Sequence, residues 1–218
     1  MSMVAGPVVA VRGESLREVM PELAQFRVVA MARDRDRETT LSRLAERAAA
    51  VRVLLDEQGR AIERRETGEL WVRPETRRSG ERVVAYHGSV STMVTVSSFT
   101  TLGELMLRIA DQDQIEVSGP WWSLRPDSPV HREARQAAIA DALRRAHEYA
   151  EALGAQVTAL VELADAGADR PPTLAAMAFS GASGGGLELD LDLDLDPRPQ
   201  TVQAAVHARF TISEPVLR

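Results

Sequence analysis

A serine in a glycine-rich stretch is the first residue whose surroundings could indicate catalysis. Residues Gly181 to Gly185 read GASGG, which matches the G-x-S-x-G pattern around the nucleophile of serine hydrolases. That nucleophile needs a buried strand before the serine and a helix after it, whereas Ser183 lies among glycines and is followed by alternating leucine and acidic residues. The pattern therefore does not predict a hydrolase, and we expect no catalytic residue.

The four histidines are the residues that could bind a metal ion. No two of them have the H-x-x-x-H spacing of a helical metal site. His87 and His207 fall on the polar faces of expected strands and could meet across neighbouring strands, but two ligands alone make a poor site. His131 and His147 fall on the polar side of an expected helix. The sequence therefore predicts no metal site and no cofactor.

The stretch GGGLELDLDLDLDPRP, from Gly184 to Pro199, has the most unusual pattern in the chain. Calcium loops also place carboxylates at alternate positions, but this stretch lacks their turn glycine and final bidentate glutamate. Two interpretations remain open: a disordered loop, or an edge strand whose leucine face docks on apolar surface of its own or a neighbouring subunit. Its leucines are therefore candidate oligomer contacts: Leu187, Leu189, Leu191, Leu193 and Leu195.

Two adjacent tryptophans, Trp121 and Trp122, are the other candidate oligomer contacts. Neighbouring side chains of a strand point to opposite faces of its sheet, so we expect one ring in the core and one outside. An exposed tryptophan more often marks an interface than a ligand pocket.

Composition limits the classes of protein to consider. The chain has 218 residues, of which 44% are hydrophobic, enough for a buried core, and no cysteine, which excludes disulfides and thiolate chemistry. A net charge of −6 argues against a nucleic-acid partner. No apolar run approaches the roughly 18 residues of a membrane span, and the start lacks the basic residues of a signal peptide. We therefore expect a cytoplasmic protein.

Alternating apolar residues predict several strands, and the run from Val8 is expected to stop at Gly13. A loop rich in glycine and proline, with alternating leucine and acidic residues, precedes the last strand at about 166–200. The expected strands are Val8–Val11, Leu23–Arg33, Ile62–Arg73, Val83–Ser97, Ile115–Leu124, Val157–Leu163 and Val202–Ile212.

Helical spacing predicts three helices between these strands. The first follows Asp36 as N-cap, and a short second one begins with a capping box of Thr101 and Glu104. The third follows Ser128 and reaches Gly154. The first helix has an apolar stripe of Leu41, Leu44, Ala45, Ala48, Val51 and Leu55. The third has an inward ridge of small residues that permits close packing, Ala134, Ala138, Ala142 and Ala146, with Leu143, Tyr149, Ala150 and Leu153 alongside.

The order of these elements indicates an α+β fold. We expect mostly antiparallel sheet or sheets packed against two or three helices, one of them long and rich in alanine. The middle of the order, strand-helix-strand-strand-helix-strand, is that of a split βαβ sandwich. We expect residues 1–218 to form a single domain, with the loop at about 166–200 as an insertion.

Several of these segments resemble the SIMPL-domain family. They are VAVRGE (Val9–Glu14), PELAQFRVVAMARDRD (Pro21–Asp36), ETGELWVRPE (Glu66–Glu75), VVAYHGSVSTMVTVS (Val83–Ser97) and the alanine-rich EARQAAIADALRRAHEYAEALG (Glu133–Gly154). The resemblance implies an α+β domain that can self-assemble. Bacterial relatives include a periplasmic antigen that forms a channel-like ring, and others are linked to oxidative-stress protection. Those relatives carry an export signal, which we do not expect in this sequence.

These observations favour a non-enzymatic, cytoplasmic protein whose partner is itself, in a dimer or ring. The alternative is an enzyme or a small-ligand binder with a site formed between subunits. A third possibility is that the chain is an adaptor for an unidentified protein partner. Only the name of the resembled family suggests it.

Overall fold

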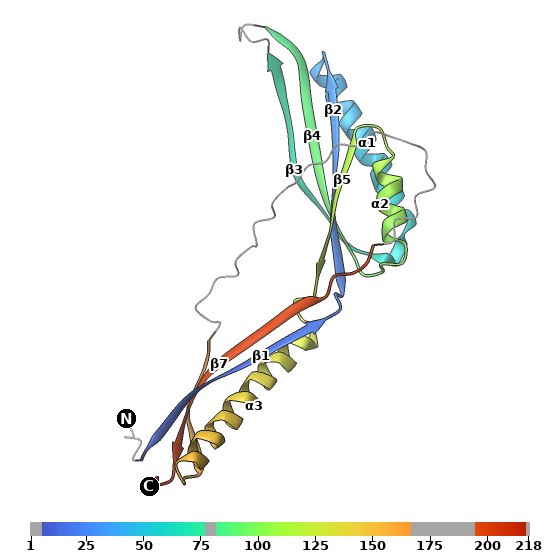
Figure 1. Cartoon of the computed structure of the whole chain (residues 1–218). Helices are drawn as coiled ribbons and strands as arrows, with labels where there is room; N and C mark the ends of the chain where they lie inside the picture. The colour runs from blue at the N-terminus through green and yellow to red at the C-terminus, as the bar shows by residue number, and fades with distance from the viewer. Residues whose placement is uncertain (1–5, 77–81, 167–194, 217–218) are drawn as a thin grey trace. The chain divides into compact units, whose positions relative to one another are not determined.

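The computed structural model describes residues 6–76, 82–166 and 195–216. Its elements follow one another in the order that the sequence predicts, and they confirm the α+β class (Figure 1). They are β1 (Val8–Val19), β2 (Leu23–Asp34), α1 (Arg37–Glu57), a 3-10 turn (Gly59–Ala61), β3 (Ile62–Thr76), β4 (Val83–Val96), α2 (Leu102–Ala110), β5 (Ile115–Ser123), α3 (Pro129–Ala152), β6 (Val157–Asp165) and β7 (Gln200–Ile212).

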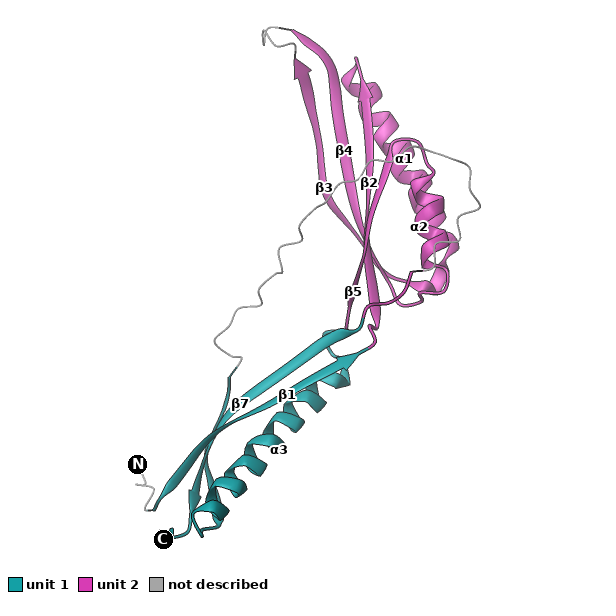
Figure 2. Cartoon of the chain, in the orientation of Figure 1, with its two compact units in different colours: residues 1–19, 126–186, 199–218 teal, residues 20–125, 187–198 magenta. Residues whose placement is uncertain are grey.

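The described residues divide into two compact units (Figure 2). Unit 1 contains residues 6–19, 126–166 and 199–216, and unit 2 contains residues 20–76, 82–125 and 195–198. Each unit has its own sheet and its own cluster of buried apolar side chains. The single domain expected over residues 1–218 is therefore built from two separate cores, because the strands form two sheets instead of one.

Unit 2 is a four-stranded antiparallel sheet in the order β3-β4-β2-β5, with α1 and α2 on the same face (Figure 1). This topology confirms the expected split βαβ arrangement. Alternate residues of β2 point towards the helices, and Phe26 and Val28 are almost fully buried among α1, α2 and β4. Within the described residues, no helix of this unit covers the other face of the sheet (Figure 1).

The helix ends of unit 2 confirm one predicted cap and correct another. Asp36 accepts a hydrogen bond from the Thr39 backbone N–H at 2.8 Å, and this bond lowers the pKa of its carboxyl. The capping box at Thr101 is wrong, because the Thr101 hydroxyl bonds Gln58 Oε1 at 3.3 Å instead of the helix backbone. In α1 the predicted stripe is too wide: Leu41 and Ala45 are exposed because the helix rests on the sheet through Leu44, Val51 and Leu55.

Unit 1 is a three-stranded antiparallel sheet in the order β1-β7-β6, with α3 along one face. The alanines of the predicted α3 ridge are fully buried, and Ala138, Ala142 and Ala146 pack against Val11 of β1 and Val206, Ala208 and Phe210 of β7. Of the residues predicted alongside them, Ala150 is buried, but Leu143, Tyr149 and Leu153 are exposed because the helix rests on the sheet through its small residues. The helix begins as expected, with the Ser128 hydroxyl accepting a bond from the Val130 N–H at 3.4 Å.

The predicted end of the first strand is wrong, because β1 continues through Gly13 to Val19. Gly13 is buried, and a Cβ atom at this position would lie 2.5 Å from the Ala142 backbone nitrogen. The glycine therefore permits close approach of α3 to an uninterrupted strand. A glycine in a strand pattern can mark close packing as well as a stop.

Candidate functional site

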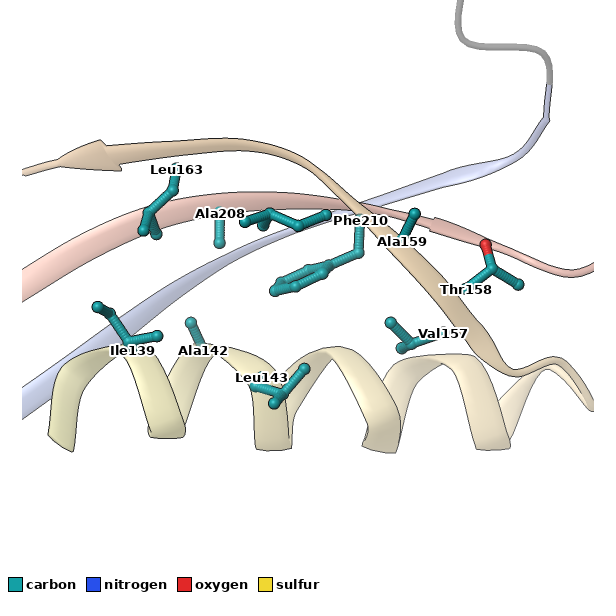
Figure 3. Close-up of a pocket in the computed structure, with 10 residues that line it drawn as sticks. Ile139, Ala142, Leu143, Val157, Thr158, Ala159, Leu163, Ala208 and Phe210 are labelled. Carbon is teal, nitrogen blue, oxygen red and sulfur yellow. The ribbon is translucent and has the colours of Figure 1, made fainter. Parts of the chain in front are cut away.

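An apolar groove of about 330 Å³ opens in unit 1 between α3 and the strands β6 and β7 (Figure 3). One wall is α3, from which Ile139 and Leu143 point towards the sheet. The other wall is β6, which contributes Leu160 and Leu163. Phe210 of β7 lies between the two walls (Figure 3).

The groove exists because α3 covers only two of the three strands. The alanine ridge seats α3 on β1 and β7. In the register of the sheet, Leu160 pairs with Phe210 and Leu163 pairs with Ala208, so both leucines share the helix-facing side of the sheet. Because β6 lies outside the strip that α3 covers, its apolar face is left beside the helix instead of beneath it.

The walls of the groove are large aliphatic side chains that remain substantially exposed. Their exposed fractions are 41% for Ile139, 41% for Leu143, 55% for Leu160 and 45% for Leu163. Phe210, between the walls, is only 7% exposed. Scattered single apolar residues are normal on a protein surface, whereas a contiguous group of this kind marks a binding surface.

Polar groups are nearly absent from the lining of the groove. The polar lining side chain is that of Thr158, and its hydroxyl is already bonded to the Thr211 carbonyl at 3.0 Å and paired with the Thr211 hydroxyl at 2.8 Å. No carboxylate, histidine or arginine is among the described residues that line it. The described lining of the groove is therefore apolar, and its one hydroxyl is already hydrogen-bonded.

Charged residues occur only at the ends of the helical wall. Residues four apart lie above one another on a helix, so Arg135, Ile139, Leu143 and His147 form one stripe of α3 beside the groove. Arg135 and His147 are exposed at the two ends of this stripe. The helical wall is thus apolar in the middle and basic or neutral at its ends.

On the side away from the groove, polar side chains of α3 contact β1, the other edge strand of the sheet. Asp141 accepts a hydrogen bond from the Glu14 backbone N–H of β1 at 3.0 Å and pairs with Arg144 and Arg145. The pKa of the Asp141 carboxyl lies below its ordinary value, first because of the Glu14 bond and then because of Arg144. A further ion pair, between Arg17 and Glu133, joins β1 to α3. The edge strand β1 is therefore held to α3 by a hydrogen bond and an ion pair. Among the described residues, no such contact from α3 is made to the other edge strand, β6.

Of the leucines predicted as oligomer contacts, only Leu195 lies within the described residues. It is partly buried and packs against the apolar cluster of unit 2, so at least part of its surface is used within its own chain. Leu187, Leu189, Leu191 and Leu193 lie outside the described residues, as does Ser183. Their predicted roles remain predictions.

The two tryptophans point to opposite faces of the unit 2 sheet, as the sequence predicts. Trp122 packs on the core cluster and meets Phe99 edge to face, with ring centroids 4.9 Å apart. Trp121 pairs with Gln25 of β2 and lies on the face away from the helices. The structure places only Trp121 where a second chain could reach it without disturbing the core.

The histidines are not brought together. His87 lies on β4 of unit 2 and His207 on β7 of unit 1, so the two strands are not neighbours in one sheet, which removes the meeting across neighbouring strands that the sequence left possible. Within residues 6–76, 82–166 and 195–216 no three histidine or acidic side chains are grouped as metal ligands.

A cluster of aromatic and charged side chains lies on the face of the unit 2 sheet that points away from α1 and α2. Trp71 stacks on His87 with ring centroids 5.9 Å apart, and the Arg73 guanidinium lies 5.0 Å from the Trp71 ring centre. Nearby, Arg33 and Glu75 form a two-bond ion pair of 2.7 and 3.1 Å that lowers the pKa of Glu75 and raises that of Arg33. Trp71 and His87 are half-buried on the neighbouring strands β3 and β4, and the more exposed Arg33–Glu75 pair links β2 to β3 across β4. These contacts are those of ordinary side-chain pairs on the surface of a sheet.

Sequence reasoning missed the groove. The signal was present in Ile139 and Leu143, which extend the apolar surface of α3 beyond its alanine ridge, and in β6, where Leu160 and Leu163 are not two residues apart. Register shifts between Val157 and Ala159 and between Leu160 and Glu162 put both leucines on one side. Strict alternation could not show this.

Comparison with known proteins places these features in a family. The model of the family described as SIMPL, protein of unknown function (DUF541), matches residues 9–210, which include most of both units. No curated protein matches the chain significantly. In the described part of the chain, no helix has the length and apolar character needed to cross a membrane.

Proposed function

Since the chain belongs to the SIMPL family (DUF541), whose description assigns no function, we propose a role for it from the groove of unit 1. In this proposal the protein is not an enzyme and associates with copies of itself, in a dimer or a ring. The observation that carries the proposal is the group of half-exposed aliphatic side chains along α3 and β6.

The energetic argument is the free energy available from covering these side chains. Full burial of an aliphatic side chain contributes about 1.5–3 kcal/mol, so covering four that are each about half exposed yields roughly 3–6 kcal/mol per copy before the entropic cost of association. Two copies that cover each other's grooves would gain this twice. A micromolar complex needs a net free energy of about 8 kcal/mol after a cost of association of about 4–15 kcal/mol, so packing of the two grooves supplies a part of what is needed and the rest of the interface supplies the remainder.

The edge strand β6 of unit 1 also has apolar side chains that are free to pack against a partner. Native proteins protect edges with charges, prolines and bulges, and β3 has all three, including Pro74 and the ion pair of Arg64 with Glu66. The edge of β1 is taken by Asp141. β6 is bulged but carries exposed leucines. We expect side-chain packing on β6, more than a long backbone ladder, to hold a partner.

A test of self-association is the native mass of the purified chain by light scattering across a concentration series. The expected result is a mass of at least twice 23.8 kDa for the natural sequence, and a return towards 23.8 kDa for the double variant Leu160→Glu/Leu163→Glu. Leu16→Glu is the matched control, because Leu16 is a strand leucine of the same unit, 68% exposed and outside the groove. A natural chain that stays monomeric at high concentration would overturn the proposal.

A small apolar ligand is the second candidate occupant of the groove. Its volume of about 330 Å³ falls at the lower end of small-molecule sites, which span roughly 300–1,000 Å³. A thermal-shift series with straight-chain fatty acids tests this alternative, since a ligand that binds the folded state raises the melting temperature. A shift that grows with chain length and disappears in the Leu160→Glu/Leu163→Glu variant would favour ligand binding over self-association.

We also propose that the protein is cytoplasmic and that it has a role in stress protection. Fractionation of cells that produce the tagged chain tests the location. Survival of a deletion strain under peroxide tests the role.

A further inference from the structure

We propose that a cleft in unit 2, between α1 and the edge strand β3, binds a small organic anion with an apolar body and a carboxylate or phosphate group. This cleft is a different surface from the groove of unit 1, and the inference does not depend on self-association. It follows from an apolar floor, a group of hydrogen-bond donors beside that floor and a guanidinium that the fold leaves unpaired.

The cleft exists because α1 covers only part of the sheet of unit 2. The helix rests mainly on β2 and β4, so the edge strand β3 lies beside it instead of beneath it. The space between them has a volume of about 250 Å³, and α1, β3 and β4 all contribute to its lining. Sites for drug-sized ligands span roughly 300–1,000 Å³, so the occupant of this cleft is a smaller molecule.

The floor of the cleft is apolar. Val51 and Leu55 of α1 are almost fully buried in the core cluster of unit 2, and Val90 of β4 packs against the same cluster. The apolar surface continues to Leu70 of β3, which pairs with Val90 in the register of the sheet and is 60% exposed. The apolar body of a ligand therefore has surface to cover in the cleft and next to it.

Hydrogen-bond donors line the cleft beside this floor. Thr67 of β3 and Thr92 of β4 are cross-strand partners, so their side chains are neighbours on one face of the sheet. Arg52 of α1 and Arg65 of β3 add two guanidiniums to the lining. Within the described residues, neither threonine hydroxyl has a hydrogen-bond partner in the fold. These groups can donate to the oxygens of a carboxylate or a phosphate.

The charges on α1 leave one cation of the cleft without a counter-ion. Asp56, one turn after Arg52, forms an ion pair of 2.6 Å with Arg65. Glu57, the other acidic residue in the last three turns of the helix, pairs with Arg108 of α2. Among the described residues, Arg52 itself has no ion pair, and it is exposed. Arg52 is therefore the cation that an anionic group would meet.

The acidic residues of β3 near the cleft do not supply that counter-ion. Glu63 pairs with Arg125. Glu66 pairs with Arg64, on the face of β3 opposite to that of its neighbour Thr67. Glu69 lies in a bulge of β3 and is exposed, so water and salt screen its charge.

Isothermal titration calorimetry with four probes tests the two parts of the ligand separately. Hexanoate and hexyl phosphate have both an anionic group and an apolar body, whereas hexanol lacks the charge and inorganic phosphate lacks the body. Both amphiphilic anions are expected to bind at least about tenfold more tightly than hexanol or inorganic phosphate, because each of these loses one set of contacts. The tighter of the two anions identifies a carboxylate or a phosphate as the preferred group.

Two results of this titration would overturn the inference. One is the absence of binding by either amphiphilic anion at millimolar concentration. The other is binding of inorganic phosphate as tight as that of hexyl phosphate, which would show that the apolar floor contributes nothing.

Arg52→Ala is expected to weaken binding of both anions at least about tenfold and to leave hexanol binding unchanged, because the unpaired cation is removed. Thr67→Val, which removes one hydroxyl, should weaken binding by a smaller factor. Arg37→Ala is the matched control, since Arg37 is an exposed arginine at the start of the same helix and outside the cleft. Circular dichroism checks that each variant is folded. Equal affinity of the natural chain and Arg52→Ala would contradict the inference.

The groove of unit 1 is a competing site for the same probes, and its variant separates the two sites. Leu160→Glu/Leu163→Glu is expected to leave binding of the anions unchanged. If this variant abolishes binding and Arg52→Ala does not, the probes occupy the groove of unit 1, and the inference about the cleft fails. Loss in Arg52→Ala alone supports the cleft, whatever the native mass of the chain.

Discussion

Gly13 of β1 lies directly against Ala142 of α3, so closely that a Cβ atom on the glycine would be 2.7 Å from the Ala142 Cβ and 2.5 Å from its backbone nitrogen. This contact seats the helix over β1 and β7, and the seating of the helix leaves β6 and its leucines uncovered. The groove of unit 1 is thus a consequence of a glycine in β1 and of the alanine ridge by which α3 contacts the sheet.

Gly13→Ala is expected to destabilise unit 1, because α3 must move away from β1 or the strand must bend. Overpacking of a tight contact costs about 1–3 kcal/mol, which urea unfolding measures as a lower midpoint. Ala10→Gly on the outer face of the same strand is the control for altered strand propensity, since Ala10 is exposed. A midpoint for Gly13→Ala equal to that of the natural chain would contradict the close packing.

Asp141→Ala is expected to lower stability at neutral pH, because the Glu14 N–H at the strand edge loses its charged acceptor. The loss is about 1–2 kcal/mol, typical of a hydrogen bond to a charged group. The folded chain lowers the pKa of Asp141 below its ordinary 3.8, so the stabilisation is full above that value and is lost as the pH falls through the lowered one.

Urea unfolding of the natural chain and of Asp141→Ala at pH 7, 5 and 3 checks this dependence. The difference in free energy between the two chains should be the same at pH 7 and 5 and should shrink at pH 3. A difference that persists unchanged at still lower pH would assign it to packing instead of to the ionised carboxylate.

Trp122→Ala is expected to cost about 2–4 kcal/mol of unfolding free energy, because the ring packs on Phe99 and the core of unit 2. Trp121→Ala should cost less than about 1 kcal/mol, because its ring lies on the helix-free face. Chemical unfolding followed by circular dichroism measures both. If Trp121 is also an oligomer contact, its variant alone should lower the native mass at fixed concentration without loss of stability.

Leu195→Ala is expected to destabilise unit 2 by about 1–2 kcal/mol, less than a fully buried leucine, because the side chain is partly buried on the core cluster. Leu16→Ala, at a position 68% exposed, should change the unfolding free energy by less than about 0.5 kcal/mol. Equal effects of the two substitutions would show that Leu195 contributes no packing. A deletion aimed at the alternating segment should therefore end before Leu195, so that changes in mass are not confused with changes in stability.

The sequence by itself determined the order of the elements, the α+β class and the buried faces of α3 and β7. These depend on local periodicity, with alanines every fourth residue of α3 and apolar residues at alternate positions of β7, and local periodicity can be read along the chain. The family also followed from these core patterns, and its match to residues 9–210 confirms it.

The division into two sheets, the path of β1 through Gly13 and the groove were decided only by the tertiary structure. Which strands pair depends on contacts between residues far apart in the chain, such as Val11 with Ala208, and a periodic pattern does not name its partner. The groove depends further on how far α3 extends over the sheet. The position of α3 over the sheet is set by the packing of Gly13 against Ala142. Because these two residues lie far apart in the sequence, no single segment shows this contact.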